Sequence, residues 1–143
     1  MVLAAKSALK GSAYLFFYGY VLTLIAAGAF GLVLARLDAR YLLGLDVSQL
    51  TPLTAATTMS QYRFLRAIEL GFGVIAFNFR NAIFHDRTFN RLFLAIMACG
   101  IGGRALGLII DGTPSLPMFF FLTFELVGIA LIVAYTRSTV RTG

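Results

Sequence analysis

The chain has 143 residues, of which 59% are hydrophobic and only 13% are charged. A soluble globular domain is normally about 45–50% apolar and about 25% charged, so this composition excludes most soluble folds and favours a membrane protein. The net charge of +6 does not indicate a nucleic-acid partner, because the basic residues mostly flank apolar segments, as the positive-inside rule requires. The single cysteine, Cys99, excludes an intrachain disulfide.

Four apolar segments predict four transmembrane helices, since each spanning helix needs about 20 apolar residues. The expected helices cover about residues 12–35, 60–79, 91–110 and 118–135. Between the first two, the apolar stretch 41–45 is expected to lie on the membrane surface, and Ser60 is expected to cap the second helix. The last two are separated by 111–117, a segment rich in turn-forming residues. No room is left for a second domain, so residues 1–143 are expected to form one transmembrane domain.

The basic residues predict the orientation of these helices. Only Arg36 and Arg40 flank the apolar segments on one side, whereas seven basic residues share the other side: Lys6, Lys10, Arg80, Arg87, Arg91, Arg137 and Arg141. Because basic residues are enriched on the cytoplasmic side of membrane proteins, both termini are expected to be cytoplasmic. The predicted fold class is therefore an all-α membrane protein, a four-helix transmembrane bundle with both ends inside.

Four charged residues fall inside the expected helices: Arg66, Glu69, Arg104 and Glu125. A charge at membrane depth costs about 2.5–3.5 kcal/mol on insertion scales, so each of them needs a partner or a function. A rise of 1.5 Å per residue puts all four about 9–14 Å from the outer ends of their helices. Asp111 lies seven residues after Arg104, on the same face of the third helix. These five residues are therefore predicted to form one intramembrane polar cluster, open toward the outer side.

Two interpretations of this cluster stay open. It can be a salt-bridge network that fixes the register of the helices, because buried ion pairs often specify packing without adding stability. It can also be a binding site, or a path for ions or protons. The equal number of positive and negative groups among Arg66, Glu69, Arg104 and Glu125 favours the structural interpretation.

Other patterns in the sequence carry less information. Gly103 and Gly107 form a GxxxG pattern, which predicts close packing of a helix inside the bundle or against a partner chain. His85, with one neighbouring carboxylate at Asp86, lacks the ligands of a metal site. No spacing typical of a catalytic nucleophile, a metal centre or a phosphate-binding loop is present, so neither an enzyme nor a cofactor is expected.

Several short motifs give the sequence a resemblance. They are Leu42-Leu43-Gly44-Leu45, Leu65-Arg66-Ala67, Gly71 with Gly73, Gly103-Arg104, Leu106-Gly107-Leu108, Asp111-Gly112 with Pro114-Ser115, and Glu125-Leu126. On these residues the chain, over about 13–135, resembles a widespread bacterial family of small four-helix membrane proteins with a domain of unknown function. It is more loosely similar to DoxX-type four-helix proteins. The resemblance implies a four-helix bundle with a polar cluster of Arg66, Arg104, Asp111 and Glu125, a location in the bacterial inner membrane, and no particular activity.

Two functions follow as expectations. The first is a non-enzymatic accessory or scaffold protein, a subunit of a larger membrane complex, because the chain is small and its glycine-rich helix faces suit packing against other membrane chains. The alternative is a binder or carrier of a small lipophilic or anionic molecule, held by Arg66 and Arg104 at an outer-facing cluster. The expected partners are the lipid bilayer and, for the first function, other membrane protein chains.

Overall fold

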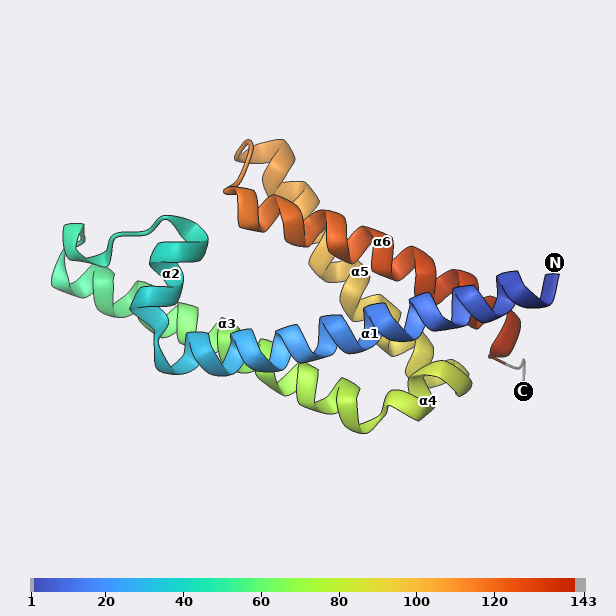
Figure 1. The fold of residues 1–143 in the computed structure, drawn as a ribbon. Helices are drawn as coiled ribbons and strands as arrows, with labels where there is room; N and C mark the ends of the chain where they lie inside the picture. The colour runs from blue at the N-terminus through green and yellow to red at the C-terminus, as the bar shows by residue number, and fades with distance from the viewer. Residues whose placement is uncertain (1, 141–143) are drawn as a thin grey trace. The chain divides into compact units, whose positions relative to one another are not determined.

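The computed structural model describes residues 2–140 (Figure 1). This range contains six α-helices, one short 3-10 helix and no strand. The elements are α1 (Val2–Val33), α2 (Ala35–Leu43), η1 (Val47–Gln49), α3 (Pro52–Asn78), α4 (Arg80–His85), α5 (Arg87–Ile110) and α6 (Leu116–Thr139). The chain divides into two compact units: a central unit, Val21–Ile75, and a terminal unit, Met1–Tyr20 with Ala76–Gly143.

Three helices in the described range are long and apolar enough to cross a membrane. They are the segments Lys6–Val33 of α1, Arg87–Ile110 of α5 and Leu116–Arg137 of α6. The prediction of an all-α protein with transmembrane helices is confirmed at this level. The 27-residue α3 does not count among them, because Arg63, Arg66 and Glu69 interrupt its apolar sequence.

The central unit is built around a close approach of α1 and α3. A Cβ atom added at Gly28 of α1 would lie 2.7 Å from the backbone nitrogen of Leu70 in α3. A Cβ atom added at Gly73 of α3 would lie 2.8 Å from the side chain of Ile25 in α1. Both separations are shorter than van der Waals contact, so only glycine allows the two helices to pack this closely here.

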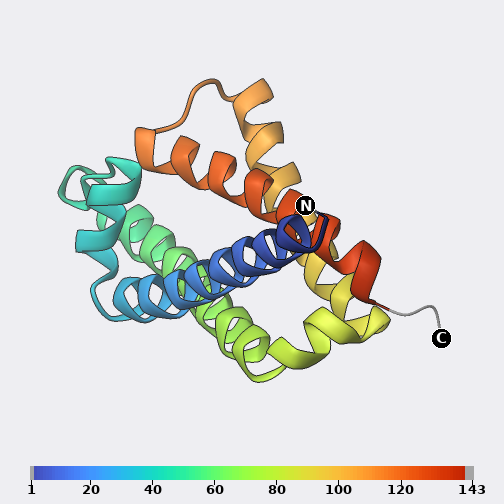
Figure 2. The same cartoon turned by 45° about the vertical axis from the view of Figure 1, so that its right-hand side comes forward.

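Helix α2 packs against the first half of α3 (Figure 2). Its small residues Ala35 and Ala39 are fully buried and pack with Met59 and Tyr62 of α3. Gly44, with a φ angle of 67°, ends the helix, because this left-handed conformation is strained for residues with a side chain. The apolar stretch 41–45, expected as a surface connection, is thus partly the last turn of α2.

The start of α3 differs from the expected one. The helix begins at Pro52, and Ser60 lies inside it, so the prediction of Ser60 as the N-cap is wrong. The hydroxyl of Thr51 accepts a hydrogen bond from the backbone N–H of Thr54 at 3.3 Å. Threonine is a favourable N-cap, and proline is favourable in the first turn, where its missing N–H is not needed. The expected second helix, 60–79, is therefore extended at its N-terminus.

An aromatic core holds the terminal unit together. Phe84 of α4 is fully buried; its ring stacks on Tyr14 of α1 with the ring centroids 4.1 Å apart. Phe17 of α1 meets Phe84 edge-on at 5.1 Å, and Tyr135 of α6 lies 5.9 Å from Phe84. Such aromatic pairs contribute about 0.5–1.5 kcal/mol each beyond the area they bury. The short helix α4, in a segment expected to be a loop, thus anchors α1 and α6.

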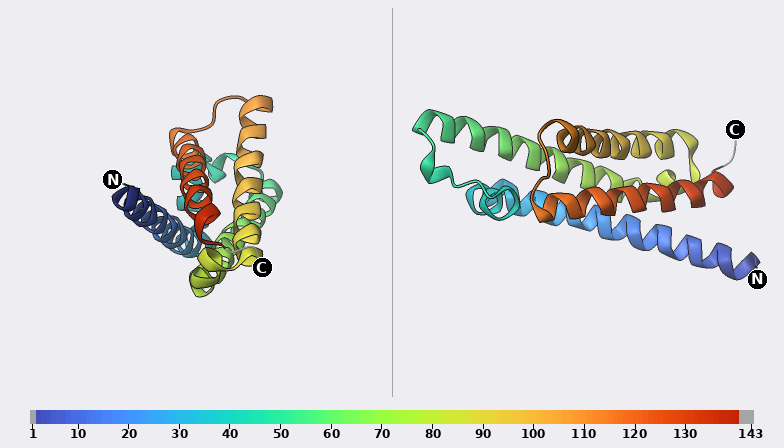
Figure 3. Two further views of the ribbon diagram at one scale, coloured as in Figure 1. Left: turned by 90° about the vertical axis from the view of Figure 1, so that its right-hand side faces the viewer. Right: turned by 90° about the horizontal axis from the view of Figure 1, so that it is seen from above.

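Helices α5 and α6 form an antiparallel hairpin (Figure 3). Helix α5 begins at Arg87 rather than near residue 91, because Asp86 caps it: the carboxylate accepts hydrogen bonds from the N–H groups of Thr88 and Phe89 at 2.8 and 3.0 Å. Helix α6 begins at Leu116, close to the expected 118, and continues to Thr139. The turn between them passes through Gly112, whose φ angle is 92°.

Candidate functional site

The first group of charges lies in the central unit. Tyr62, Arg66 and Glu69 are three or four residues apart on α3, a spacing that puts them on one face of the helix. The guanidinium group of Arg66 contacts Asp38 of α2 through Nε at 2.7 Å and through Nη2 at 2.6 Å. Its Nη1 donates to Glu69 Oε2 at 2.5 Å. The hydroxyl of Tyr62 accepts from Arg66 Nη2 at 3.0 Å and donates to Asp38 Oδ2 at 2.7 Å.

The group formed by Asp38, Tyr62, Arg66 and Glu69 is largely buried. The side chains of Arg66 and Asp38 are 9% and 8% exposed, and Gly31 of α1 leaves no room for a Cβ atom against either of them. Removing one partner of a buried ion pair costs about 3–5 kcal/mol, because the remaining charge stays buried without compensation. The arrangement therefore connects α1, α2 and α3, and it leaves the Arg66 side chain only 9% exposed.

The second group lies in the terminal unit, between α5 and α6. Arg104 of α5 donates through Nε to Glu125 Oε2 of α6 at 3.1 Å. Its Nη1 lies 3.4 Å from the sulfur of Met118, and its Cζ lies 5.8 Å from the centre of the Phe121 ring. The side chain of Glu125 is only 8% exposed, whereas that of Arg104 is 30% exposed. Arg104 is thus held from one side and accessible from the other.

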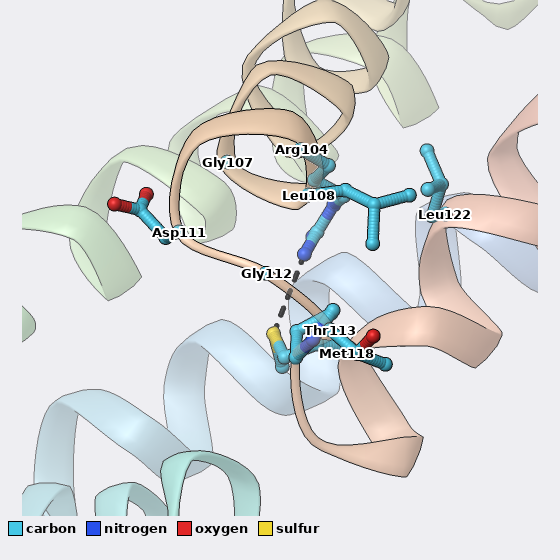
Figure 4. Close-up of a pocket in the computed structure, with 9 residues that line it drawn as sticks. Arg104, Gly107, Leu108, Asp111, Gly112, Thr113, Met118 and Leu122 are labelled. Carbon is cyan, nitrogen blue, oxygen red and sulfur yellow. Dashed lines mark hydrogen bonds between the residues drawn. The ribbon is translucent and has the colours of Figure 1, made fainter.

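A cavity of about 290 Å³ adjoins Arg104 (Figure 4). Most of its lining is apolar or glycine, and the lining residues are Arg104, Gly107, Leu108, Asp111, Gly112, Thr113, Pro114, Met118 and Leu122. Ligand pockets typically combine apolar walls with a few polar groups that orient the ligand. Figure 4 shows the guanidinium group of Arg104 directed toward Met118, while the carboxylate of Asp111 points away from it.

The structure brings together some of the five predicted cluster residues. Arg66 pairs with Glu69, Arg104 pairs with Glu125, and Asp111 lines the cavity beside Arg104 without an ion pair to it within the described range. The two pairs belong to different compact units, so a single cluster that joins all five residues stays a prediction.

Three contact residues were not expected from the sequence: Asp38, Tyr62 and Met118. Asp38 lies between Arg36 and Arg40, in a segment expected to lie outside the membrane, although Ala35, Asp38 and Ala39 share one helical face on which the two alanines mark a buried side. Tyr62 lies four residues before Arg66, which is the spacing of a side-chain pair on a helix. Nothing in the sequence distinguishes Met118 from other apolar residues at the start of α6.

At Gly103 and Gly107, the glycines predicted to pack helices, an added Cβ atom would meet no other helix. Nothing lies within 4 Å of a Cβ atom added at Gly103, and only the carboxylate of Asp111 lies near Gly107, at 3.8 Å. Gly128 of α6 makes a close approach to α1, because a Cβ atom there would overlap the ring of Phe16 in α1. Packing of Gly103 and Gly107, inside the bundle or against a partner chain, stays a prediction.

Comparison with known proteins gives a family for the chain. No curated protein matches it, and no solved structure matches it. The looser likeness to DoxX-type proteins stays a prediction. A family model matches residues 12–136, from within α1 to the last turn of α6. The chain therefore belongs to the DUF4345 family, which is defined by a domain of unknown function.

Proposed function

We propose that this protein binds a small lipophilic molecule inside the membrane, in the cavity between α5 and α6. The observation that supports this function is the position of Arg104: its side chain is 30% exposed and lines a cavity of about 290 Å³ with mainly apolar walls. The volume is just below the usual range for ligand pockets, about 300–1,000 Å³. The matching ligand is a compact molecule rather than a complete lipid.

The charges around the cavity favour an uncharged ligand. Glu125 already balances Arg104, and Asp111 adds a further negative charge to the lining. An anionic ligand would have to displace Glu125 from Arg104 and separate this buried carboxylate from its positively charged partner, which is costly. A neutral ligand with a carbonyl or hydroxyl oxygen can instead accept a hydrogen bond from Arg104 Nη2, which has no protein acceptor among residues 2–140.

The proposed topology is a four-helix bundle with α3 as the fourth span. Its 27 residues give a length of about 40 Å, enough to cross a bilayer. Its charges Arg66 and Glu69 are paired within the central unit, which lowers the cost of placing them at membrane depth. With both termini cytoplasmic, as the basic residues favour, the α5–α6 turn faces outward in the bacterial inner membrane. The cavity then opens toward the outer side.

Gly107→Phe is expected to abolish ligand binding while the protein stays folded. The position lines the cavity, and its nearest neighbour beyond the helix is the flexible carboxylate of Asp111 at 3.8 Å, so a phenyl ring can enter the space that the ligand would occupy. Phenylalanine is also a better helix former than glycine. The measurement is mass spectrometry of small molecules extracted from protein purified in membrane discs without detergent.

Gly103→Phe is the matched control for this experiment. Gly103 precedes Gly107 by about one turn of the same helix, has nothing within 4 Å of an added Cβ atom, and does not line the cavity. Wild type and Gly103→Phe should share one molecule, in about one copy per chain, that Gly107→Phe lacks. Equal amounts of every small molecule in all three preparations would contradict the binding function.

A second candidate function is that of a non-enzymatic accessory subunit of a membrane complex. The observation that favours it is the open face of α5 at Gly100 and Gly103, three residues apart, where nothing lies within 4 Å of an added Cβ atom. Small residues let helices from different chains approach closely in lipid. Under this function a partner chain should co-purify with the wild type, and Gly103→Phe should release it.

A further inference from the structure

Helix α2 carries two arginines on its exposed side. Its inner side is formed by Ala35, Asp38 and Ala39, which are buried against the central unit. Arg36 and Arg40 are exposed and lie four residues apart, so their side chains are neighbours on the helix surface. Neither arginine forms an ion pair or a hydrogen bond with any side chain in the range 2–140.

A cavity of about 340 Å³ lies beside both arginines, between α2 and η1. Its lining consists of Arg36, Leu37, Arg40, Leu45, Asp46, Val47 and Ser48. The carboxylate of Asp46 accepts hydrogen bonds from the backbone N–H of Ser48 at 3.0 Å and from its hydroxyl at 2.6 Å. Asp46 is therefore engaged in capping η1 and makes no ion pair with the guanidinium groups in the part of the chain that the structure describes.

The charge of this cavity is positive. Hydrogen bonds from Ser48 lower the pKa of Asp46 below its ordinary value, so Asp46 is a carboxylate at neutral pH and contributes one negative charge. Arg36 and Arg40 contribute two positive charges. Asp38, the acidic residue of α2, is buried and is paired with Arg66. The lining thus has a net charge of about +1, and two guanidinium groups are available to an anion.

An apolar edge adjoins the two arginines on α2. Leu37 is 43% exposed and Tyr41 is 75% exposed, and both belong to the same outer side of the helix. Helices with apolar and basic residues on adjacent faces lie in the interface of a bilayer, and tyrosine is enriched at that level. This edge distinguishes a lipid from a free anion, because acyl chains beside Leu37 and Tyr41 would bury apolar surface that a soluble phosphate leaves exposed.

We propose that α2 lies in the membrane interface and that Arg36 and Arg40 together bind the phosphate group of an anionic phospholipid. Guanidinium groups suit phosphate oxygens because their N–H donors form parallel, charge-assisted hydrogen bonds. The interaction holds the outer side of α2 against the bilayer surface, while Asp38 on its inner side holds the helix against α3.

The test is native mass spectrometry of the full chain in a mild detergent, titrated with phosphatidylglycerol or with phosphatidylcholine. Wild type should bind one phosphatidylglycerol molecule more tightly than phosphatidylcholine. The double variant Arg36→Gln/Arg40→Gln should bind phosphatidylglycerol about tenfold or more weakly, since each basic residue near an anionic lipid surface contributes to affinity. Arg63→Gln, an exposed arginine of α3 in the same unit, is the matched control and should bind as the wild type does.

Three results would overturn the proposal. One is unchanged phosphatidylglycerol binding by the double variant with its melting temperature retained. Another is an equal loss in the double variant and in Arg63→Gln, which would indicate a general effect of net charge. The third is displacement of the bound lipid by millimolar inorganic phosphate, which would identify a site for a free anion. If the double variant melts at a lower temperature than the wild type, Arg36→Lys/Arg40→Lys takes its place in the titration. This variant keeps both positive charges but loses the paired N–H donors of the guanidinium groups, so it should also bind phosphatidylglycerol more weakly.

Discussion

Arg66→Ala is expected to lower the free energy of unfolding by about 3–5 kcal/mol, the cost of breaking a buried ion pair by removing one partner. The change leaves the buried carboxylate of Asp38 without its cation. It also removes the hydrogen bond that Arg66 donates to the hydroxyl of Tyr62. Because these contacts connect α2 to α3, the loss should be concentrated in the central unit. Unfolding in detergent, followed by circular dichroism as temperature or denaturing detergent increases, measures the effect.

Arg63→Ala provides the control for this result. Arg63 is on the same helix and is exposed, so its removal should change the free energy of unfolding by no more than about 0.5 kcal/mol. The double variant Asp38→Asn/Arg66→Met should lose less free energy of unfolding than Asp38→Asn and Arg66→Met lose together. Each single change leaves one buried charge without its partner, whereas the double change removes both charges. Additive single and double effects would contradict the idea that Asp38 and Arg66 act as one unit.

Gly28→Val is expected to prevent normal packing of α1 on α3. A valine Cβ atom at this position would lie 2.7 Å from the backbone nitrogen and 2.9 Å from the Cα atom of Leu70. Backbone atoms of a helix cannot move aside as a flexible side chain can, so the two helices must separate. Overpacking of this kind costs about 1–3 kcal/mol or more. The measurement is the same unfolding experiment, with hydrogen exchange to locate the loosened residues.

Gly71→Val is the matched variant, because Gly71 of α3 has nothing within 4 Å of an added Cβ atom. It should leave the melting temperature close to that of the wild type. In Gly28→Val, faster exchange is expected at the end of α1 and across the facing turns of α3, with the aromatic core around Phe84 unchanged. Equal stability of the two valine variants would show that α1 and α3 do not approach closely in the membrane.

The sequence predicts the charged residues of the structure better than it predicts their partners. An arginine in an apolar helix is conspicuous, so Arg66 and Arg104 stand out, and Glu69 and Glu125 follow as counter-charges. Asp38 is not conspicuous, because it lies between Arg36 and Arg40 in a segment with the composition of a loop. Its role depends on α2 packing against α3, a tertiary feature that local patterns do not encode.

Helix boundaries and glycine roles show the same limit. Asp86 as a cap and Thr51-Pro52 as a helix start are readable local signals, but the polar sequence after Pro52 obscured the early start of α3. The GxxxG pattern at Gly103 and Gly107 identifies small residues without showing which helix, if any, they face. Gly28, Gly73 and Gly128 have the close contacts, and each depends on which face of its helix the fold turns inward.

The most direct test of the central claim, that the α5–α6 cavity binds a small lipophilic molecule, is to identify everything that co-purifies with the wild-type chain. The protein is extracted from its native membrane under mild conditions, and both proteins and small molecules are quantified by mass spectrometry. Besides the anionic phospholipid proposed at α2, the account predicts one compact, uncharged organic molecule in about one copy per chain, with no protein in fixed ratio. Partner chains in fixed ratio without such a molecule would contradict it and would establish the accessory-subunit function instead.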